Sequence, residues 1–265
     1  MKLTKAQEQI LNMGLIAGGA SANKGGRILV KNLDTVEHME YALNKAFLSN
    51  DAFSFRLKAI QGHYEWHTTP YRPIHFEVLR FDSLEKLDTY GEALTKQPID
   101  LLGALFDFKI VYVEGMAGIG GKVHHVIGDA WSAALLGRQL SALLEGTEVS
   151  FYSYQNYIIK QNQYLQSVRH QRDKAFFSQQ LQEITNETPL ISHYPASFRS
   201  ARKTLLIEKS FAEDIRNYAA AHNAYPYAVL MTAVAVCMNR LHNNAERFFL
   251  GMTMLNRSGV QENNT

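Results

Sequence analysis

The chain has 265 residues, of which 46% are hydrophobic and 20% charged, and its formal net charge at pH 7 is +2. This composition is typical of a globular protein with enough apolar side chains for one large domain or two packed ones. The small net charge argues against a nucleic-acid-binding protein, and a single cysteine excludes an intrachain disulfide. The polar N-terminus resembles neither a signal peptide nor a membrane anchor, so we expect a cytoplasmic protein that binds no membrane.

The first part of the chain is predicted to mix helices with short strands. Met39, Leu43 and Phe47 recur at helical spacing, which predicts a helix with one buried face. Gln61 and Gly62 separate two alternating segments, which is typical of a hairpin. The expected elements are, in chain order, a helix over 3–15, a flexible glycine-rich stretch over 14–26, a strand over 27–30, a helix over 35–48, strands over 53–60, 63–68 and 74–81, and a helix over 84–96.

The second part begins with two strands that flank a glycine-rich segment, residues 115–121. These glycines join a strand to a strand, which favours a hairpin turn over a phosphate-binding loop. The segment over 185–199 breaks the pattern and predicts a boundary between parts 1–184 and 185–265. The expected elements are strands over 106–114 and 122–127, helices over 130–144, 152–166 and 170–184, a strand over 203–209, helices over 211–222 and 227–241, and a strand over 248–254. Strands and helices mixed in this way indicate α/β or α+β layering.

The segment from His124 to Ser132 carries the strongest chemical signal in the sequence. His124 and His125 are predicted to end a strand, and a neutral imidazole can accept a proton near neutral pH. Neighbouring strand residues face opposite sides of a sheet, so only one of the two histidines can point into a given cleft. Asp129 precedes an amphipathic helix, where an aspartate is a favoured N-cap.

This segment, HHVIGDA, resembles the HHxxxDG signature of condensation domains, the acyl-transfer units of nonribosomal peptide synthetases. The order and approximate spacing of further motifs agree along nearly the whole chain. The matching segments are the opening AQ-containing helix at 3–7, a degraded RHExLR segment at 50–53, the PFDL…GPLFR approach at 98–106, a variant of the YxDFxxWQ block at 154–161, and the strand at 251–257 that ends in Asn256-Arg257.

The resemblance implies a chloramphenicol acetyltransferase-like fold of two subdomains, with α/β (α+β layered) architecture. Residues 1–184 would form the N-terminal subdomain and residues 185–265 part of the C-terminal one. Because family members continue well beyond the segment that matches Arg257, we expect an incomplete second subdomain and a chain that is inactive on its own.

The resemblance also implies the reaction and its partners. The amine of an aminoacyl acceptor would attack the thioester of an acyl or aminoacyl donor, and the product is an amide. Both substrates are carried on 4'-phosphopantetheine arms of donor and acceptor peptidyl carrier proteins, beside neighbouring synthetase domains, and no cofactor is bound directly. His125 would be catalytic, either as a general base or by holding the amine through a hydrogen bond.

Other residues receive supporting roles from the resemblance. His124 is predicted to be a packed scaffold residue, Trp131 a core residue, and Asp129 a structural residue paired with either Arg56 or Arg257. Ala130, Ser132 and Asn256 are predicted to line the substrate tunnel. Three further histidines, His63, His67 and His75, form no metal-ligand motif with cysteines or carboxylates in the sequence, so we expect no metal site.

Two other functions stay open at this point. A stand-alone HxxxD acyltransferase would use a coenzyme A or carrier thioester, but the doubled histidine favours a condensation domain. A non-catalytic module that only docks a carrier protein would explain the eroded motifs, whereas the intact segment from His125 to Ser132 argues against it.

Overall fold

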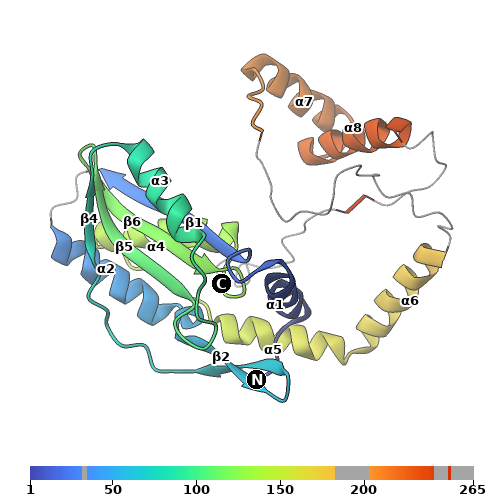
Figure 1. Ribbon diagram of the computed structural model, residues 1–265. Coiled ribbons are helices and arrows are strands. Elements are labelled where there is room, and N and C mark those ends of the chain that lie inside the picture. The colour runs from blue at the N-terminus through green and yellow to red at the C-terminus, as the bar shows by residue number, and fades with distance from the viewer. Residues whose placement is uncertain (32–34, 183–202, 242–249, 252–265) are drawn as a thin grey trace. The chain divides into compact units, whose positions relative to one another are not determined.

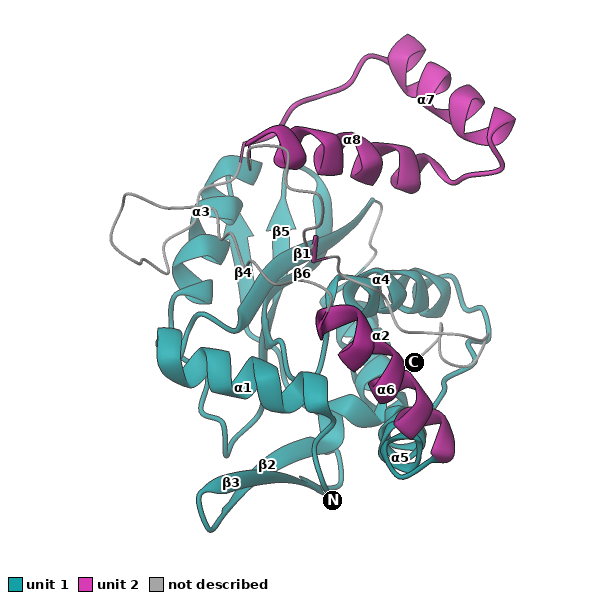
Figure 2. Cartoon of the chain, turned by 90° about the vertical axis from the view of Figure 1, so that its right-hand side faces the viewer, with its two compact units in different colours: residues 1–167, 256–265 teal, residues 168–255 magenta. Residues whose placement is uncertain are grey.

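The computed structural model describes residues 1–31, 35–182, 203–241 and 250–251 (Figure 1). The chain divides into two units, the first including residues 1–167 and the second starting at Val168 (Figure 2). Both strands and helices are present, as the mixed pattern of the sequence predicts. Each unit is described by itself.

A four-stranded sheet with the order β1-β6-β5-β4 forms the centre of the first unit. Neighbouring strands are antiparallel except for β4 and β5, which are parallel. The register pairs Asn23 with His124, so the start of β1 lies beside the end of β6. The strands are β1 (Asn23–Lys31), β4 (Val78–Phe81), β5 (Phe106–Val113) and β6 (Met116–His124).

Helices cover both faces of this sheet (Figure 1). α3 (Leu84–Thr95) lies on one face, where Leu87 packs with the inward-facing valines of β5. α2 (Val36–Ser49) and α4 (Ala130–Leu144) lie on the other, over the larger core. The predicted face of α2 is fully buried there, and the ring of its Phe47 stacks on that of Phe53 with centroids 3.9 Å apart.

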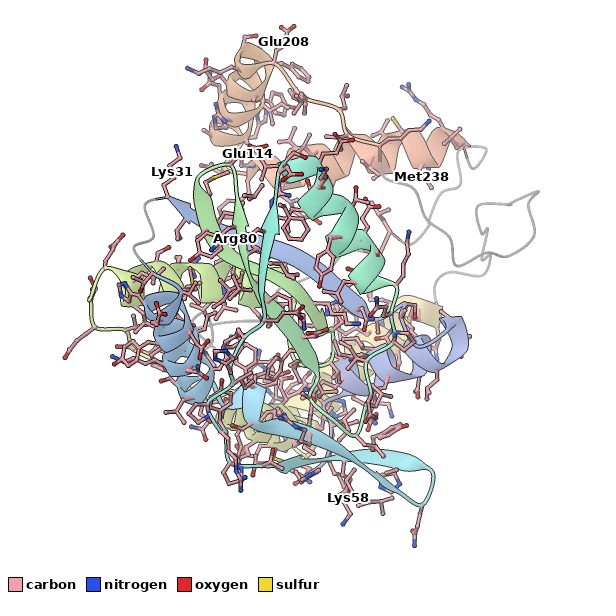
Figure 3. The ribbon with its side chains drawn as sticks, turned by 60° about the vertical axis from the view of Figure 1, so that its left-hand side comes forward. Lys31, Lys58, Arg80, Glu114, Glu208 and Met238 are labelled. Carbon is pink, nitrogen blue, oxygen red and sulfur yellow. The ribbon has the colours of Figure 1, made fainter. Side chains whose placement is uncertain are left out.

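The end of the sheet where β5 turns into β6 is tied to α3 through Glu114 (Figure 3). Glu114 has a φ of 49° and Gly115 a φ of 74°, which makes a tight turn. The carboxylate of Glu114 accepts a hydrogen bond from the backbone N–H of Leu84 and so caps the start of α3. On the edge strand β4, the guanidinium of Arg80 lies 4.5 Å from the ring centroid of Tyr112.

The rest of the first unit packs around the opposite end of the sheet. α1 (Lys5–Ala17) begins with a capping box formed by Thr4 and Gln7. The other elements are the 3-10 helix η1 (Asp51–Ser54), the hairpin strands β2 (Phe55–Ile60) and β3 (His63–Thr68), and α5 (Tyr154–Leu165). The carboxylate of Asp51 accepts hydrogen bonds from Ser153 Oγ and from the backbone N–H groups of residues 154 and 155, so it fixes the start of α5.

The second unit is helical in its described part. It contains α6 (Val168–Gln182), α7 (Lys209–Ala221) and α8 (Pro226–Leu241), and the last two helices contact each other. Within the described ranges of the chain, no helix combines the length and apolarity needed to cross a membrane.

Several predicted elements are confirmed and others are wrong. The helix over 130–144 and the hairpin at Gln61-Gly62 form as predicted. The glycine-rich segment 115–121 is not a turn, because all of it except Gly115 belongs to β6. The expected strand over 27–30 is longer and begins at Asn23, whereas β4 covers only the end of the expected 74–81.

The expected strand over 203–209 is also wrong. Residues 203–208 pair with no described strand, and residue 209 already belongs to α7. A strand needs a neighbour for its backbone hydrogen bonds, and local sequence does not supply one. The expected strand over 248–254 lies outside the described residues except for residues 250–251.

Candidate active site

His125 is the first residue after β6 and opens the turn that leads into α4. Its backbone N–H donates to the carbonyl oxygen of Ala22 at 2.8 Å, which ties the turn to the start of β1. Its imidazole is half-buried, with Nδ1 2.8 Å from the carbonyl oxygen of Gly128. A carbonyl oxygen can only accept, so the proton of the neutral ring lies on Nδ1 and Nε2 keeps its lone pair. The ring therefore presents a hydrogen-bond acceptor at Nε2.

His124 has the opposite arrangement. Its side chain is 2% exposed, and its Nδ1 accepts a hydrogen bond from the backbone N–H of Val126 at 3.2 Å. The neutral ring therefore carries its proton on Nε2. Burial, with a smaller contribution from the neighbouring His125, lowers the pKa of His124 to about 4, so this ring is neutral at pH 7. Its role as a scaffold residue stays a prediction, with a packed and hydrogen-bonded side chain in its favour.

Acidification is expected to destabilise the fold through His124. The pKa of this side chain is about 4 in the folded chain against 6.5 as the ordinary value, so below pH 6.5 the unfolded chain binds a proton that the folded chain does not. The contribution of neutral His124 to the free energy of unfolding is therefore complete above pH 6.5 and is lost as the pH falls towards 4. Between about pH 7.5 and pH 5, the free energy of unfolding should fall by about 2 kcal/mol on this account.

Urea unfolding at the two pH values measures this loss of unfolding free energy. In His124→Gln the loss between the same pH values should be smaller by about the amount that His124 contributes. His67→Gln serves as the control, because His67 lies exposed on the β3 strand and its replacement should leave the loss between the two pH values in place. An equal loss in wild type and His124→Gln would contradict the assignment.

Asp129 starts α4 as its N-cap. Its Oδ1 accepts from both the backbone N–H and the hydroxyl of Ser132, each at 2.8 Å, and the Asp129 N–H lies 3.3 Å from Ser132 Oγ. This reciprocal pair fixes the end of the turn that begins at His125. The hydroxyl of Ser132 is engaged in this cap.

Removing the cap should destabilise the chain measurably. Asp129→Ala is expected to lower the free energy of unfolding by about 1 to 2 kcal/mol, because an orphan N–H of α4 loses its acceptor. Asp129→Asn should cost much less, since asparagine is an equally good N-cap. Chemical denaturation of both variants measures the difference, and equal stability of the two would rule out a capping role.

Arg56 and Trp131 are two predicted residues whose surroundings the structure describes. Arg56 does not pair with Asp129, because its Nη1 donates to the carbonyl oxygens of Phe53 and Phe55. Burial lowers the pKa of Arg56. Trp131 is half-buried and lies outside the core cluster of described residues, so its core position stays a prediction.

Trp131 also has a contact within its own helix. The guanidinium carbon of Arg138, two turns further along α4, lies 5.5 Å from the centroid of its ring. Ala130 is exposed at the first position of the helix. Asn256 and Arg257 lie outside the described residues.

Two of these histidines lie near carboxylates in the structure. His75 Nδ1 lies 3.0 Å from Glu40 Oε1, and His63 Nε2 lies 3.6 Å from Glu65 Oε1. In the described part of the chain, no three metal-ligating side chains come together.

Sequence reasoning gave no role to Gln7, yet this residue reaches the site. Its Nε2 donates to the carbonyl oxygen of Val126 in the turn beside His125. The available signal was a polar side chain on the apolar face of α1, where Leu3 and Leu11 are also buried.

Comparison with known proteins identifies the family. The family model for the condensation domain matches residues 1–265, so the chain belongs to the condensation-domain family, as its motifs predict. Condensation domains form amide bonds in nonribosomal peptide synthesis, between substrates held on phosphopantetheine arms of carrier proteins.

The relatives are large synthetases. One plipastatin synthase subunit of Bacillus subtilis is 25% identical over 262 residues, which are 90% of this chain and 10% of that protein. Surfactin synthase subunit 1 of the same organism is 23% identical, over 91% of this chain and 7% of that protein. The chain thus spans a tenth or less of each of these relatives.

Solved structures of the same fold support the predicted architecture. The first condensation domain of the calcium-dependent antibiotic synthetase matches with a TM-score of 0.79 at 17% identity, over 100% of this chain and 66% of that one. The condensation domain of the monacolin K polyketide synthase MokA matches with a TM-score of 0.80 at 14% identity, over 99% and 64%. The predicted α/β fold of the chloramphenicol acetyltransferase type is confirmed.

Proposed function

We propose that this chain supplies the catalytic histidine of a condensation site that joins a carrier-bound acyl or aminoacyl thioester to a carrier-bound aminoacyl amine. The observation that carries the proposal is the orientation of the His125 ring. The contact of its Nδ1 with the Gly128 carbonyl oxygen leaves Nε2 free to accept a hydrogen bond or a proton.

The chemistry then follows from that nitrogen. The acceptor amine attacks the carbonyl carbon of the donor thioester, a C–N bond forms, and the C–S bond breaks. Nε2 of His125 takes the proton that the amine loses, and the same proton neutralises the departing thiolate. Gly128 stabilises the transient imidazolium through the Nδ1–H bond. If His125 only holds the amine, it uses the same lone pair.

Positioning contributes the rest of the acceleration. Holding two tethered substrates in reactive orientation can remove about 7 kcal/mol or more of the barrier. In this proposal residues 1–184 are the N-terminal condensation subdomain and residues 185–265 part of the C-terminal one. Ala130, Ser132 and Asn256 would line the tunnel, and Arg257 would pair with Asp129.

The partners in this proposal are donor and acceptor peptidyl carrier proteins and the neighbouring domains of a synthetase. The names of the relatives, which belong to plipastatin and surfactin synthases, support that setting. A cytoplasmic location agrees with it, and no cofactor would be bound by the chain itself.

The test is product formation by the synthetase that contains this chain. A loaded donor carrier and a loaded acceptor carrier are mixed with it, and intact mass spectrometry follows the acceptor carrier. A mass increase equal to the donor acyl group is the expected result. Carrier binding without any product would indicate a docking module instead, and equal rates with coenzyme A donors would indicate a stand-alone acyltransferase.

A further inference from the structure

The peptide groups of Val126, next to His125, are held from both sides. The Val126 N–H donates to His124 Nδ1 at 3.2 Å, and the Val126 carbonyl oxygen accepts from Gln7 Nε2 at 3.1 Å. The Val126 side chain is 1% exposed, so water is a poor substitute for either partner.

The amide of Gln7 uses all of its hydrogen-bonding capacity. Its Oε1 accepts from the Thr4 N–H at 2.9 Å and from Trp66 Nε1 at 3.0 Å. Its Nε2 donates to Val126 at 3.1 Å and to the hydroxyl of Tyr154 at 2.8 Å. Because two donors face Oε1 and a carbonyl faces Nε2, a flipped amide would bring like groups together. The donor is therefore aimed at Val126 in one orientation, and Gln7 itself is only 3% exposed.

The Val126 carbonyl controls the path of the chain to Gly128. Rotating this peptide changes ψ of Val126 and φ of Ile127, and Gly128 follows directly. Gly128 in turn supplies the carbonyl oxygen that holds His125 Nδ1. A buried carbonyl that loses its donor is unfavourable, and the peptide relieves that cost by turning towards another donor.

We propose that Gln7 is a positioning residue for His125. By fixing the Val126 carbonyl, it keeps Gly128 where it holds the proton on Nδ1 and leaves Nε2 as the acceptor. The inference deepens the proposed function, since it rests on His125 acting through Nε2, but the tautomer itself can be measured without any turnover.

The test is nitrogen NMR of the chain labelled with ¹⁵N-histidine, near pH 8, with His125 assigned by comparison with His125→Ala. The variant Gln7→Glu keeps the size of the side chain and both acceptor contacts, and an ionised carboxylate has no proton to donate to Val126. Wild type should show a protonated Nδ1 and a bare Nε2 for His125. Gln7→Glu should show a tautomer mixture, with part of the proton moved to Nε2.

The control is Tyr154→Phe, which removes one hydrogen bond of the same Nε2 and leaves the Val126 bond in place. It should keep the wild-type His125 signals. Unchanged signals in Gln7→Glu, or an equal change in Tyr154→Phe, would overturn the proposal. If Gln7→Glu does not fold, Gln7→Met removes the donor without adding a charge and is judged by the same signals.

Turnover gives a second readout. In the condensation assay, Gln7→Glu should lower kcat about tenfold while KM for the loaded acceptor carrier changes less than about twofold, because misplacement of His125 affects the reacting geometry more than carrier docking. A rise in KM alone would overturn the proposal. If His125→Ala proves silent, the proposed function fails, while the NMR result still decides the role of Gln7.

Discussion

Replacing His125 with alanine is expected to lower the rate of amide formation by roughly 10²- to 10⁴-fold, the range contributed by a positioned general base. Nε2 is the acceptor that the Gly128 contact leaves available, and alanine removes it. The variant should fold normally, because His125 is half-buried and its backbone hydrogen bond to Ala22 does not involve the side chain. Intact mass spectrometry of the acceptor carrier over time measures the rate.

The matched control is His67→Ala. This histidine is exposed on β3, so its loss tests whether removing any imidazole lowers the rate. Wild-type turnover by His67→Ala together with a wild-type thermal unfolding curve for His125→Ala would assign the loss to chemistry. Undiminished product from His125→Ala would remove His125 from the mechanism and favour an alternative function.

The parts of the site that could be predicted from sequence are those encoded locally. α4 has the bounds that its apolar periodicity and the Asp129 cap predict, since both signals act within a few residues. The same holds for the hairpin at Gln61-Gly62, where both residues have positive φ. The strand expected over 122–127 ends earlier, at His124, so His125 lies in the turn that leads to α4 and not in the strand.

The parts that could not be predicted depend on residues far apart in the chain. Gln7 and Val126 are 119 positions apart, and no local pattern connects an opening helix to a turn after β6. Sequence spacing makes Arg56 one of two candidates to pair with Asp129, but its guanidinium donates to backbone carbonyl oxygens beside it. Tertiary packing decides which polar groups contact each other, and the spacing of residues along the sequence does not show this packing.

The glycines of β6 are a second case in which tertiary contacts could not be predicted from the sequence. Glycine-rich sequence usually indicates a turn, yet here the missing side chains allow neighbouring strands to approach. A methyl group at Gly118 would overlap the carbonyl oxygen of Ile28 in β1, and one at Gly121 would overlap that of Asp107 in β5. The composition of the segment therefore reflects tertiary contacts of a strand on both sides.

Gly121→Ala is accordingly expected to be among the most destabilising single changes in the first unit. Besides Asp107, the new methyl group would lie 2.7 Å from both Cα and Cδ1 of Phe108, whose ring packs against the core. Backbone atoms of β5 cannot move without breaking its pairing with β6. We expect a loss of about 3 kcal/mol or more in the free energy of unfolding, measured with urea, at the upper end of the range for overpacking.

The control lies directly across the sheet, because Gly26 of β1 pairs with Gly121. A methyl group at Gly26 meets no atom within 4 Å, so Gly26→Ala should change the free energy of unfolding by less than about 1 kcal/mol. Equal losses in the two variants would mean that the stability depends on the backbone properties of glycine and not on the close approach of β5 to Gly121. A stable Gly121→Ala would contradict the register of β5 and β6. That register also sets the site, because β6 ends only three residues later at His124 and delivers His125 into its turn.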